Sequence, residues 1–159
     1  MGKAQDFHFP HCAIEVKTTV TQQPERLTIS NEQQLDDSGI ETLLLLHLAF
    51  DIHSNEDETL PSLVESLRSL LQDFTAAKMA FERSLFHAGY LDIHAPLYAS
   101  TGYRHLSSSY FRVASGFPRL VPSDLVTGIS HVRYAISLNA CRPFAIAESE
   151  ALKILNSQE

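Results

Sequence analysis

The sequence predicts a mixed α/β fold, in which a small sheet has helices packed against it. Strand-like segments come first, two helix-like segments follow, and further strand-like segments close the chain. With 159 residues, 44% hydrophobic and 19% charged, the chain suits one folded domain with a real core. We therefore expect a single domain over 1–159, with a core over 1–54, a helical part over 60–88 and a β-rich part over 98–159.

Four strands are expected in the first third of the chain. The last of them is apolar on both faces until Asp51, which is typical of a central strand. Ser30 lies where the third strand ends, and its hydroxyl can cap the free amides of a helical turn over 31–37. The expected strands are 6–9, 12–20, 26–30 and 43–53.

Two helices are expected next, over 60–72 and 73–87. Leucine and valine recur at three–four spacing in the first, and Gly89 is placed to end the second. The polar segment 55–58 before them is typical of a solvated turn and is too short for a calcium loop. The expected apolar stripe of the second helix is Phe74, Ala77, Phe81, Leu85 and Phe86. Beyond the helices we expect strands over 107–113 and 132–138 and a closing helix over 148–156.

Net charge and composition exclude some classes of protein. A net charge of −7 argues against a protein that holds nucleic acid by bulk electrostatics, although an acidic metal site is compatible with it. The sequence contains no apolar run of 18 residues and no apolar leader segment, so we expect neither a membrane span nor a signal peptide. Cys12 and Cys141 do not have the spacing of a metal site, and a reducing cytoplasm is the expected compartment.

The segment from Asp6 to Lys17 carries the most chemical information. Side chains alternate along a strand, so Glu15 and Lys17 share a face. An antiparallel pairing about Pro10-His11 sets Asp6 directly opposite Glu15 on that face. Two facing carboxylates repel each other unless a cation offsets their charge, and Mg²⁺ accepts carboxylate oxygens while keeping positions for water and a phosphate. The pattern predicts Mg²⁺ (or Mn²⁺) held by Asp6 and Glu15.

Lys17 lies beside two carboxylates in this arrangement. A charged lysine that orients water and stabilises developing negative charge is therefore a simpler role for it than that of a free base. His8 shares the face of Asp6 and could touch water at the metal. The alternative interpretation is a solvated strand face, which is what an isolated Glu-Xaa-Lys triplet usually represents.

Other candidate chemistry has weaker support. His47 lies in an apolar strand and is expected to be a core histidine, and the remaining histidines lack the spacing of a zinc site. Ser107 to Ser109 are expected in a strand or loop rather than as a nucleophile. Aromatic and arginine residues of the same region could stack on bases, although core and edge positions are favoured for them. These are Tyr103, Arg104, Tyr110, Phe111 and Arg112.

Asp6, followed nine residues later by Glu15-Val16-Lys17 on an adjacent strand, resembles the PD-(D/E)XK nuclease superfamily. Together with four further stretches it is similar to a bacterial family of PD-(D/E)XK motif proteins, first catalogued as a domain of unknown function. The resemblance implies a restriction-endonuclease-like central mixed sheet flanked by helices, with a C-terminal strand region. The further stretches are 13–19, 27–30 with Gln34-Leu35, 117–120 and 132–134.

The resemblance implies roles for four residues. Asp6 and Glu15 correspond to the metal ligands and Lys17 to the catalytic lysine. Gln34 follows the third strand, where related nucleases place a polar residue near the site; an exposed polar residue is the alternative for it. The implied activity is that of a Mg²⁺-dependent endonuclease acting on DNA, in bacterial restriction or phage defence. The resemblance leaves room for a homodimer or for partner proteins of a defence system.

The chain departs from the family pattern at its start. Members of the family carry a substantial N-terminal part, including a helix that can bring a further acidic residue to the metal. This chain begins almost at the strand of Asp6, so we expect it to represent the C-terminal portion of a longer pattern. The alternative function is therefore a truncated, catalytically inactive nuclease-fold module that binds DNA or a protein partner.

Overall fold

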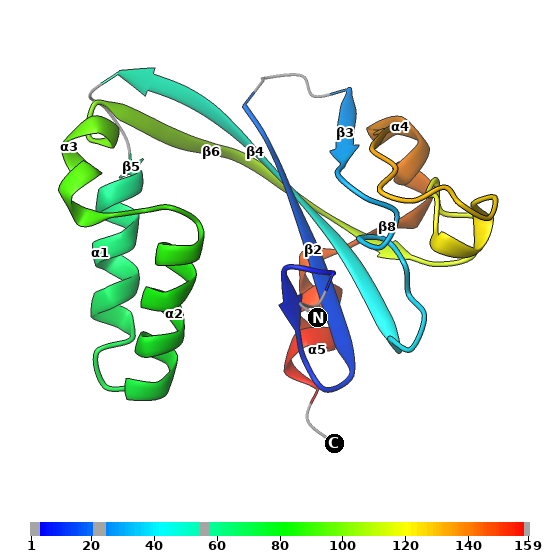
Figure 1. The fold of residues 1–159 in the computed structure, drawn as a ribbon, viewed down its shortest axis with the longest axis horizontal. Helices are drawn as coiled ribbons and strands as arrows, with labels where there is room; N and C mark the ends of the chain where they lie inside the picture. The colour runs from blue at the N-terminus through cyan, green and yellow to red at the C-terminus, as the bar shows by residue number, and fades with distance from the viewer. Residues whose placement is uncertain (1–3, 21–24, 55–57, 158–159) are drawn as a thin grey trace. The chain divides into compact units, whose positions relative to one another are not determined.

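The computed structural model describes residues 4–20, 25–54 and 58–157 and confirms the mixed α/β class (Figure 1). Its described strands form a mixed sheet of six strands and a separate sheet of two. By internal contacts the chain divides into two compact units: the first comprises residues 1–50 and 106–159, and the second comprises residues 51–105. The expected single domain over 1–159 stays a prediction, because this division describes contacts and not folding units.

The large sheet runs through the first unit in the order β1-β2-β4-β6. β1 pairs with β2 in antiparallel fashion and β2 pairs with β4 in parallel, which makes the sheet mixed. β4 is central, as predicted, because β2 and β6 flank it on both sides. The strands are β1 (Phe7–His8), β2 (Cys12–Thr19), β4 (Thr42–Ser54), β6 (Thr101–Val113) and β8 (Ala145–Ile146), of which β8 pairs with β6.

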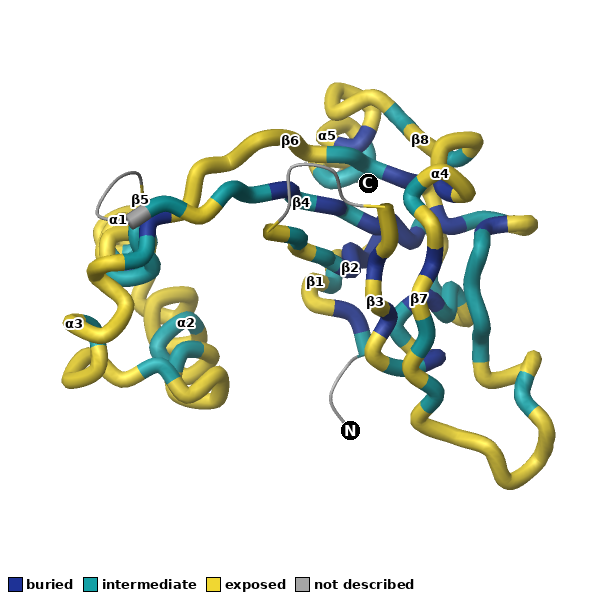
Figure 2. The backbone as a smooth tube through the Cα atoms, turned by 90° about the horizontal axis from the view of Figure 1, so that it is seen from above, coloured by how far each residue is buried: buried dark blue, intermediate teal, exposed yellow. Residues whose placement is uncertain are grey.

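The two faces of this sheet are covered by different elements. On one face, Ala13 and Leu45 pack in a buried cluster with Leu27 of β3 (Arg26–Ile29) and Ile136 of β7 (Tyr134–Ser137). β3 and β7 form the two-stranded sheet, with Leu27 opposite Ile136. On the other face, Ile14 packs against α5 (Glu148–Asn156), the predicted closing helix (Figure 2). Glu15 and Lys17 alternate with Ile14, so they project on the side of Ala13, which we call the site face.

The second unit contains the predicted helical part. Thr59 and Ser62 form a reciprocal hydrogen-bonded cap at the start of the first helix. Arg68 then forms ion pairs with Glu65, Glu82 and Asp92, joining the two long helices to the turn after them. Gly89 ends the second helix with a φ of +80°, as predicted. The elements are β5 (Glu58–Thr59), α1 (Leu60–Leu70), α2 (Thr75–His87), η1 (Asp92–His94) and α3 (Ala95–Tyr98).

Several expected elements have different extents in the structure. The predicted stripe of α2 was wrong, because α2 has no buried residue and Phe86 is 68% exposed. The first strand covers only Phe7–His8, and β6 begins at Thr101 instead of residue 107. Residues 31–37 form hydrogen-bonded turns and not a helical turn. Of the predicted polar turn over 55–58, residues 55–57 lie outside the described residues.

The C-terminal part contains short helices that the sequence pattern did not predict. The expected strand over 132–138 is confined to β7, because Leu138 already begins α4. No helix in the described ranges combines the length and apolar character that a membrane crossing requires. The short helices are η2 (Pro122–Asp124), α4 (Leu138–Cys141) and η3 (Arg142–Phe144).

Candidate active site

The β1–β2 hairpin brings Asp6 to Glu15. Phe7 lies opposite Ile14 and His8 opposite Ala13, which confirms the register predicted from the sequence. The turn is closed by a hydrogen bond of 2.8 Å from the Phe9 amide to the Cys12 carbonyl, so it does not need the amide hydrogen that Pro10 lacks. Asp6 directly precedes β1. Its carboxylate accepts a hydrogen bond of 2.8 Å from the amide of Val16, the neighbour of Glu15.

Glu15 is an ionisable side chain in the core of the sheet. It is 0% exposed, whereas Asp6 is exposed beside it. Lys17 Nζ lies 2.7 Å from Glu15 Oε1, and in the described part of the chain neither Glu15 oxygen has a partner of regular hydrogen-bond geometry besides this ion pair. Burial raises the pKa of Glu15; the Lys17 ammonium opposes the rise, and the Asp6 carboxylate adds to it.

Lys17 is held from a second direction by Gln34. Lys17 Nζ donates a hydrogen bond of 2.9 Å to Gln34 Oε1, and the same oxygen accepts one of 2.8 Å from the Ser30 amide. Gln34 is half-buried, so the structure does not show the exposed polar residue that was its alternative. The Ser30 backbone amide thus donates to the side chain of Gln34, and the Gln33 backbone amide donates a hydrogen bond of 2.9 Å to Asn31 Oδ1.

Gln5 fixes the turn that carries Gln34, and sequence reasoning missed it. Its buried side-chain amide donates hydrogen bonds to the carbonyl oxygens of Gln33, at 2.9 Å, and of Asp36, at 3.2 Å. The N-terminal segment that presents Asp6 is thereby tied to the segment that presents Gln34. No motif or spacing distinguishes this glutamine in the sequence.

Two residues of the C-terminal part of the chain, Arg119 through its side chain and Val132 through its backbone amide, hold the same turn. Arg119 donates two hydrogen bonds of 3.0 Å to the Asp37 carboxylate and one of 2.7 Å to the Leu35 carbonyl. Buried Glu32 accepts a hydrogen bond of 2.8 Å from the Val132 amide. Arg119 and Val132 belong to two of the stretches that resemble the family, so these stretches position the Gln34 turn.

Replacing Arg119 by methionine is expected to destabilise the fold by about 2–4 kcal/mol. The change removes a two-pronged pair with Asp37 and leaves the Leu35 carbonyl without its charged donor, and hydrogen bonds to charged groups contribute about 1.5–3 kcal/mol. Urea unfolding should show a lower midpoint. Arg133→Met removes the same charge from an exposed position and is the matched control; equal midpoints for the two variants would contradict this role of Arg119.

Three histidines and the two cysteines were also considered as candidates, and the structure places each of them. His8 lines a cavity with Gln5 and Asp36, and Asp6 is not among the residues that line it. His11 forms a hydrogen bond of 2.6 Å with the Ile154 carbonyl. His47 is a buried core histidine, as predicted, and is hydrogen-bonded to Thr19 Oγ1 at 2.9 Å. Both cysteines, Cys12 and Cys141, are free and buried.

The expected base-stacking residues mostly have structural roles. Phe111 is buried in the cluster on the site face, and Tyr110 packs against the cluster under α5. Arg112 forms an ion pair of 3.2 Å with Glu150. Tyr103 is 38% exposed and belongs to the second unit. The favoured interpretation of core and edge aromatics therefore agrees with their burial.

The donor set at Asp6 and Glu15 fits a small divalent cation. Residues 4–20, 25–54 and 58–157 contain no group of three or more His, Cys, Asp and Glu side chains arranged to hold a metal. Mg²⁺, however, commonly takes one or two carboxylates together with waters and substrate phosphate. The buried Glu15 carboxylate, beside the exposed carboxylate of Asp6, suits that demand.

A mixed sheet with an Asp beside a strand-borne Glu-Xaa-Lys is consistent with a protein of the PD-(D/E)XK-like class. Comparison with family models supports the same class: the model described as "Putative PD-(D/E)XK family member (DUF4420)" matches residues 1–139. The chain belongs to this family, as the resemblance of its sequence predicted. Neither the curated proteins nor the solved structures contain a match to the chain.

Proposed function

We propose that the chain is a metal-dependent nuclease that hydrolyses DNA phosphodiester bonds. The observation that carries this proposal is the Glu15 carboxylate, buried on the site face, paired with Lys17 at 2.7 Å and adjacent to Asp6. A buried carboxylate is costly for a fold unless its charge is used or compensated. Membership of a PD-(D/E)XK family supports the same chemistry.

Asp6 and Glu15 would hold Mg²⁺ or Mn²⁺ at this position. The cation would supply charge that stabilises the attacked phosphate and lowers the pKa of an attacking water. Glu15 must be deprotonated to bind it, and because burial raises the pKa of Glu15, metal affinity should rise with pH through that range.

Lys17 would contact the phosphate. In the structure its ammonium group compensates Glu15 and donates to Gln34. When a cation compensates Glu15 instead, Lys17 stays anchored by Gln34 and still has two further N–H groups to direct at a phosphate oxygen. Gln34 is thus proposed as the residue that positions Lys17, and Lys17 as the group that stabilises developing negative charge.

Purified chain incubated with supercoiled plasmid is expected to nick or linearise it with Mg²⁺ or Mn²⁺, and to stop when a chelator is added. Lys17→Ala should lower the rate about 10²–10³-fold, the usual loss on removing one donor to a developing anion. Lys153→Ala, which removes an exposed lysine of α5, is the matched control and should cleave at the wild-type rate. Gel electrophoresis of timed samples measures the cleavage rate of the wild-type chain and of both variants.

Cleavage that persists in Lys17→Ala, or no cleavage with either metal, would overturn the nuclease proposal. In the second case, DNA binding without cleavage would favour the alternative of a non-catalytic nuclease-fold module. The family resemblance also supports a role in bacterial restriction or phage defence. Plaque counts on cells that express the wild-type chain or Lys17→Ala test that role, which requires protection by the wild type alone.

A further inference from the structure

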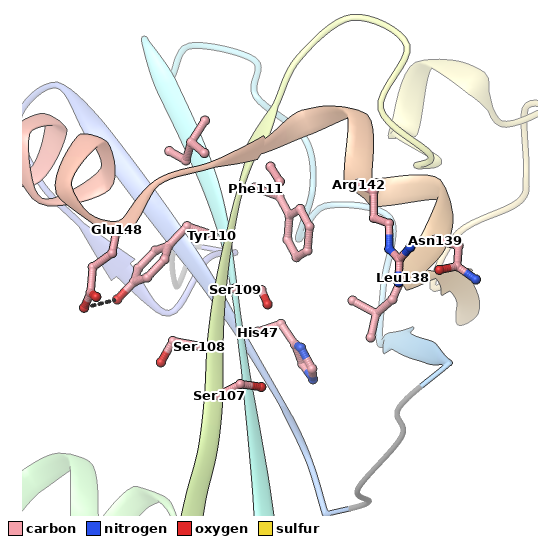
Figure 3. Close-up of a pocket in the computed structure, with 12 residues that line it drawn as sticks. His47, Ser107, Ser108, Ser109, Tyr110, Phe111, Leu138, Asn139, Arg142 and Glu148 are labelled. Atoms are coloured by element: carbon pink, nitrogen blue, oxygen red, sulfur yellow. Dashed lines mark hydrogen bonds between the residues drawn. The ribbon is translucent and has the colours of Figure 1, made fainter.

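A second polar cavity opens in the first unit, beside the central strands. It has a volume of about 410 Å³, within the range of small-molecule sites. Strands β4 and β6 form one wall, and the segment of α4 and η3 forms the other (Figure 3). Its polar lining includes His47, Ser107, Ser109, Asn139 and Arg142.

The hydroxyl groups of Ser107 and Ser109 face the same side of the sheet as the candidate active site. Figure 3 shows Ser107 and Ser109 pointing to the side of His47, with Asn139 and Arg142 across from them. Glu148, the acidic residue of the lining, lies on the opposite side of β6, where its carboxylate accepts a hydrogen bond of 3.4 Å from Tyr110. The side toward His47 is therefore rich in hydrogen-bond donors.

Arg142 gives this cavity a positive charge that the described side chains do not compensate. In the ranges that the structure describes, the Arg142 side chain has neither an ion pair nor a hydrogen bond, and Arg142 is exposed. Arg112 and Arg119 of the same unit each pair with a carboxylate. A guanidinium beside a carboxamide and hydroxyls matches the oxygens of a phosphate group.

The cavity is close to the candidate active site along the sheet. His47 lies beside Lys17 in the parallel register of β2 and β4, and β6 is the next strand. Neighbouring strands are about 4.8 Å apart, so β6 is about 10 Å from the strand of Glu15. A distance of this order is within reach of a few nucleotides of one DNA strand, whose axial rise is about 3.4 Å each.

We propose that this cavity binds a backbone phosphate of DNA a few nucleotides from the bond that is cut. Arg142 provides the charge, and Asn139 and Ser109 provide hydrogen bonds. The inference rests on the proposed function for the identity of the ligand, because the second phosphate belongs to the same substrate. Contacts of this kind set the register of a nucleic acid on a protein and carry no sequence preference.

The test measures binding separately from cleavage. A fluorescein-labelled DNA duplex of 20 base pairs is titrated with Lys17→Ala chain in Ca²⁺, so that hydrolysis does not consume the probe, and anisotropy is followed across a series of salt concentrations. Adding Arg142→Gln should weaken binding about tenfold and reduce the slope of log K against log salt by about 1. Arg142→Lys, which keeps the charge, should retain the slope, and Arg133→Gln is the matched control for charge.

An unchanged slope in Arg142→Gln, an equal loss in Arg133→Gln, or no binding of the duplex at low salt would overturn the proposed phosphate site. Failure of the phosphate site can be distinguished from failure of the nuclease proposal. A wild-type chain that does not cut DNA, but whose binding depends on Arg142 in the expected way, would keep the phosphate site and lose the nuclease.

Discussion

Replacing Glu15 by glutamine is expected to abolish DNA cleavage and to stabilise the folded chain at neutral pH. Glutamine has nearly the same shape but no charge, so it removes a proposed metal ligand. Metal ions contribute several kcal/mol to stabilising the charge of a transition state, and 1.36 kcal/mol is tenfold in rate, so cleavage should fall by at least about a thousandfold. The gain in stability follows from the burial of a carboxylate that is 0% exposed.

The pH dependence of this stability has a definite sign. Burial raises the pKa of Glu15 in the folded state above its ordinary value of 4.5. Between the unfolded and the folded pKa the folded state binds more protons, so stability falls as pH rises through that window. The cost of Glu15 is therefore absent below pH 4.5 and complete above the raised folded pKa, whereas glutamine carries no such cost at any pH.

Urea unfolding of wild type and Glu15→Gln from pH 4.5 to pH 8 measures this difference. The stability advantage of the variant should grow with pH across the window and then level off. Lys17 keeps its hydrogen bond to Gln34 in the variant, so its charge is not left without a partner. A variant that is less stable than wild type by the same amount at every pH would show that the Glu15–Lys17 ion pair outweighs the burial of the carboxylate.

Replacing Leu45 by alanine is expected to cost about 2–5 kcal/mol of unfolding free energy. Leu45 is fully buried in the cluster on the site face and lies opposite Glu15 in the register of β2 and β4. Removing a buried leucine side chain loses its transfer free energy and leaves a cavity. Because small proteins are stable by only about 5–15 kcal/mol, the variant should unfold at a much lower urea concentration.

Leu152→Ala is the matched control for Leu45→Ala. Leu152 is 46% exposed on α5, and its truncation should change the unfolding free energy by no more than about 0.5 kcal/mol. A similarly small change in the unfolding free energy of Leu45→Ala would show that the buried cluster beside Glu15 relaxes without cost. Such a result would contradict the view that this cluster supports the candidate active site.

The arrangement of Asp6, Glu15 and Lys17 could be predicted because it depends on local geometry. Alternation along one strand decides the shared face, and the symmetry of a hairpin about Pro10-His11 decides the register. The central position of β4 followed from a run that is apolar on both faces. None of these inferences required knowledge of residues far away in the chain.

The anchors of the Gln34 turn could not be predicted in the same way. Gln5 is 28 residues from Gln33, and Arg119 is 82 residues from Asp37. Polar residues such as these look like surface residues in a sequence, because their partners are carbonyl oxygens and carboxylates of distant segments. The apolar stripe of α2 failed for a related reason, since spacing alone shows that a helix is amphipathic and does not show what covers it.

The dependence of the Gln34 turn on Arg119 and Val132 has a consequence for the newly made chain. Asp6, Glu15 and Lys17 are translated before the two anchors, Arg119 and Val132. A nascent chain would present the carboxylates and the lysine without a fixed glutamine behind them. Competence of the proposed site would then begin only after Arg119 and Val132 have been translated.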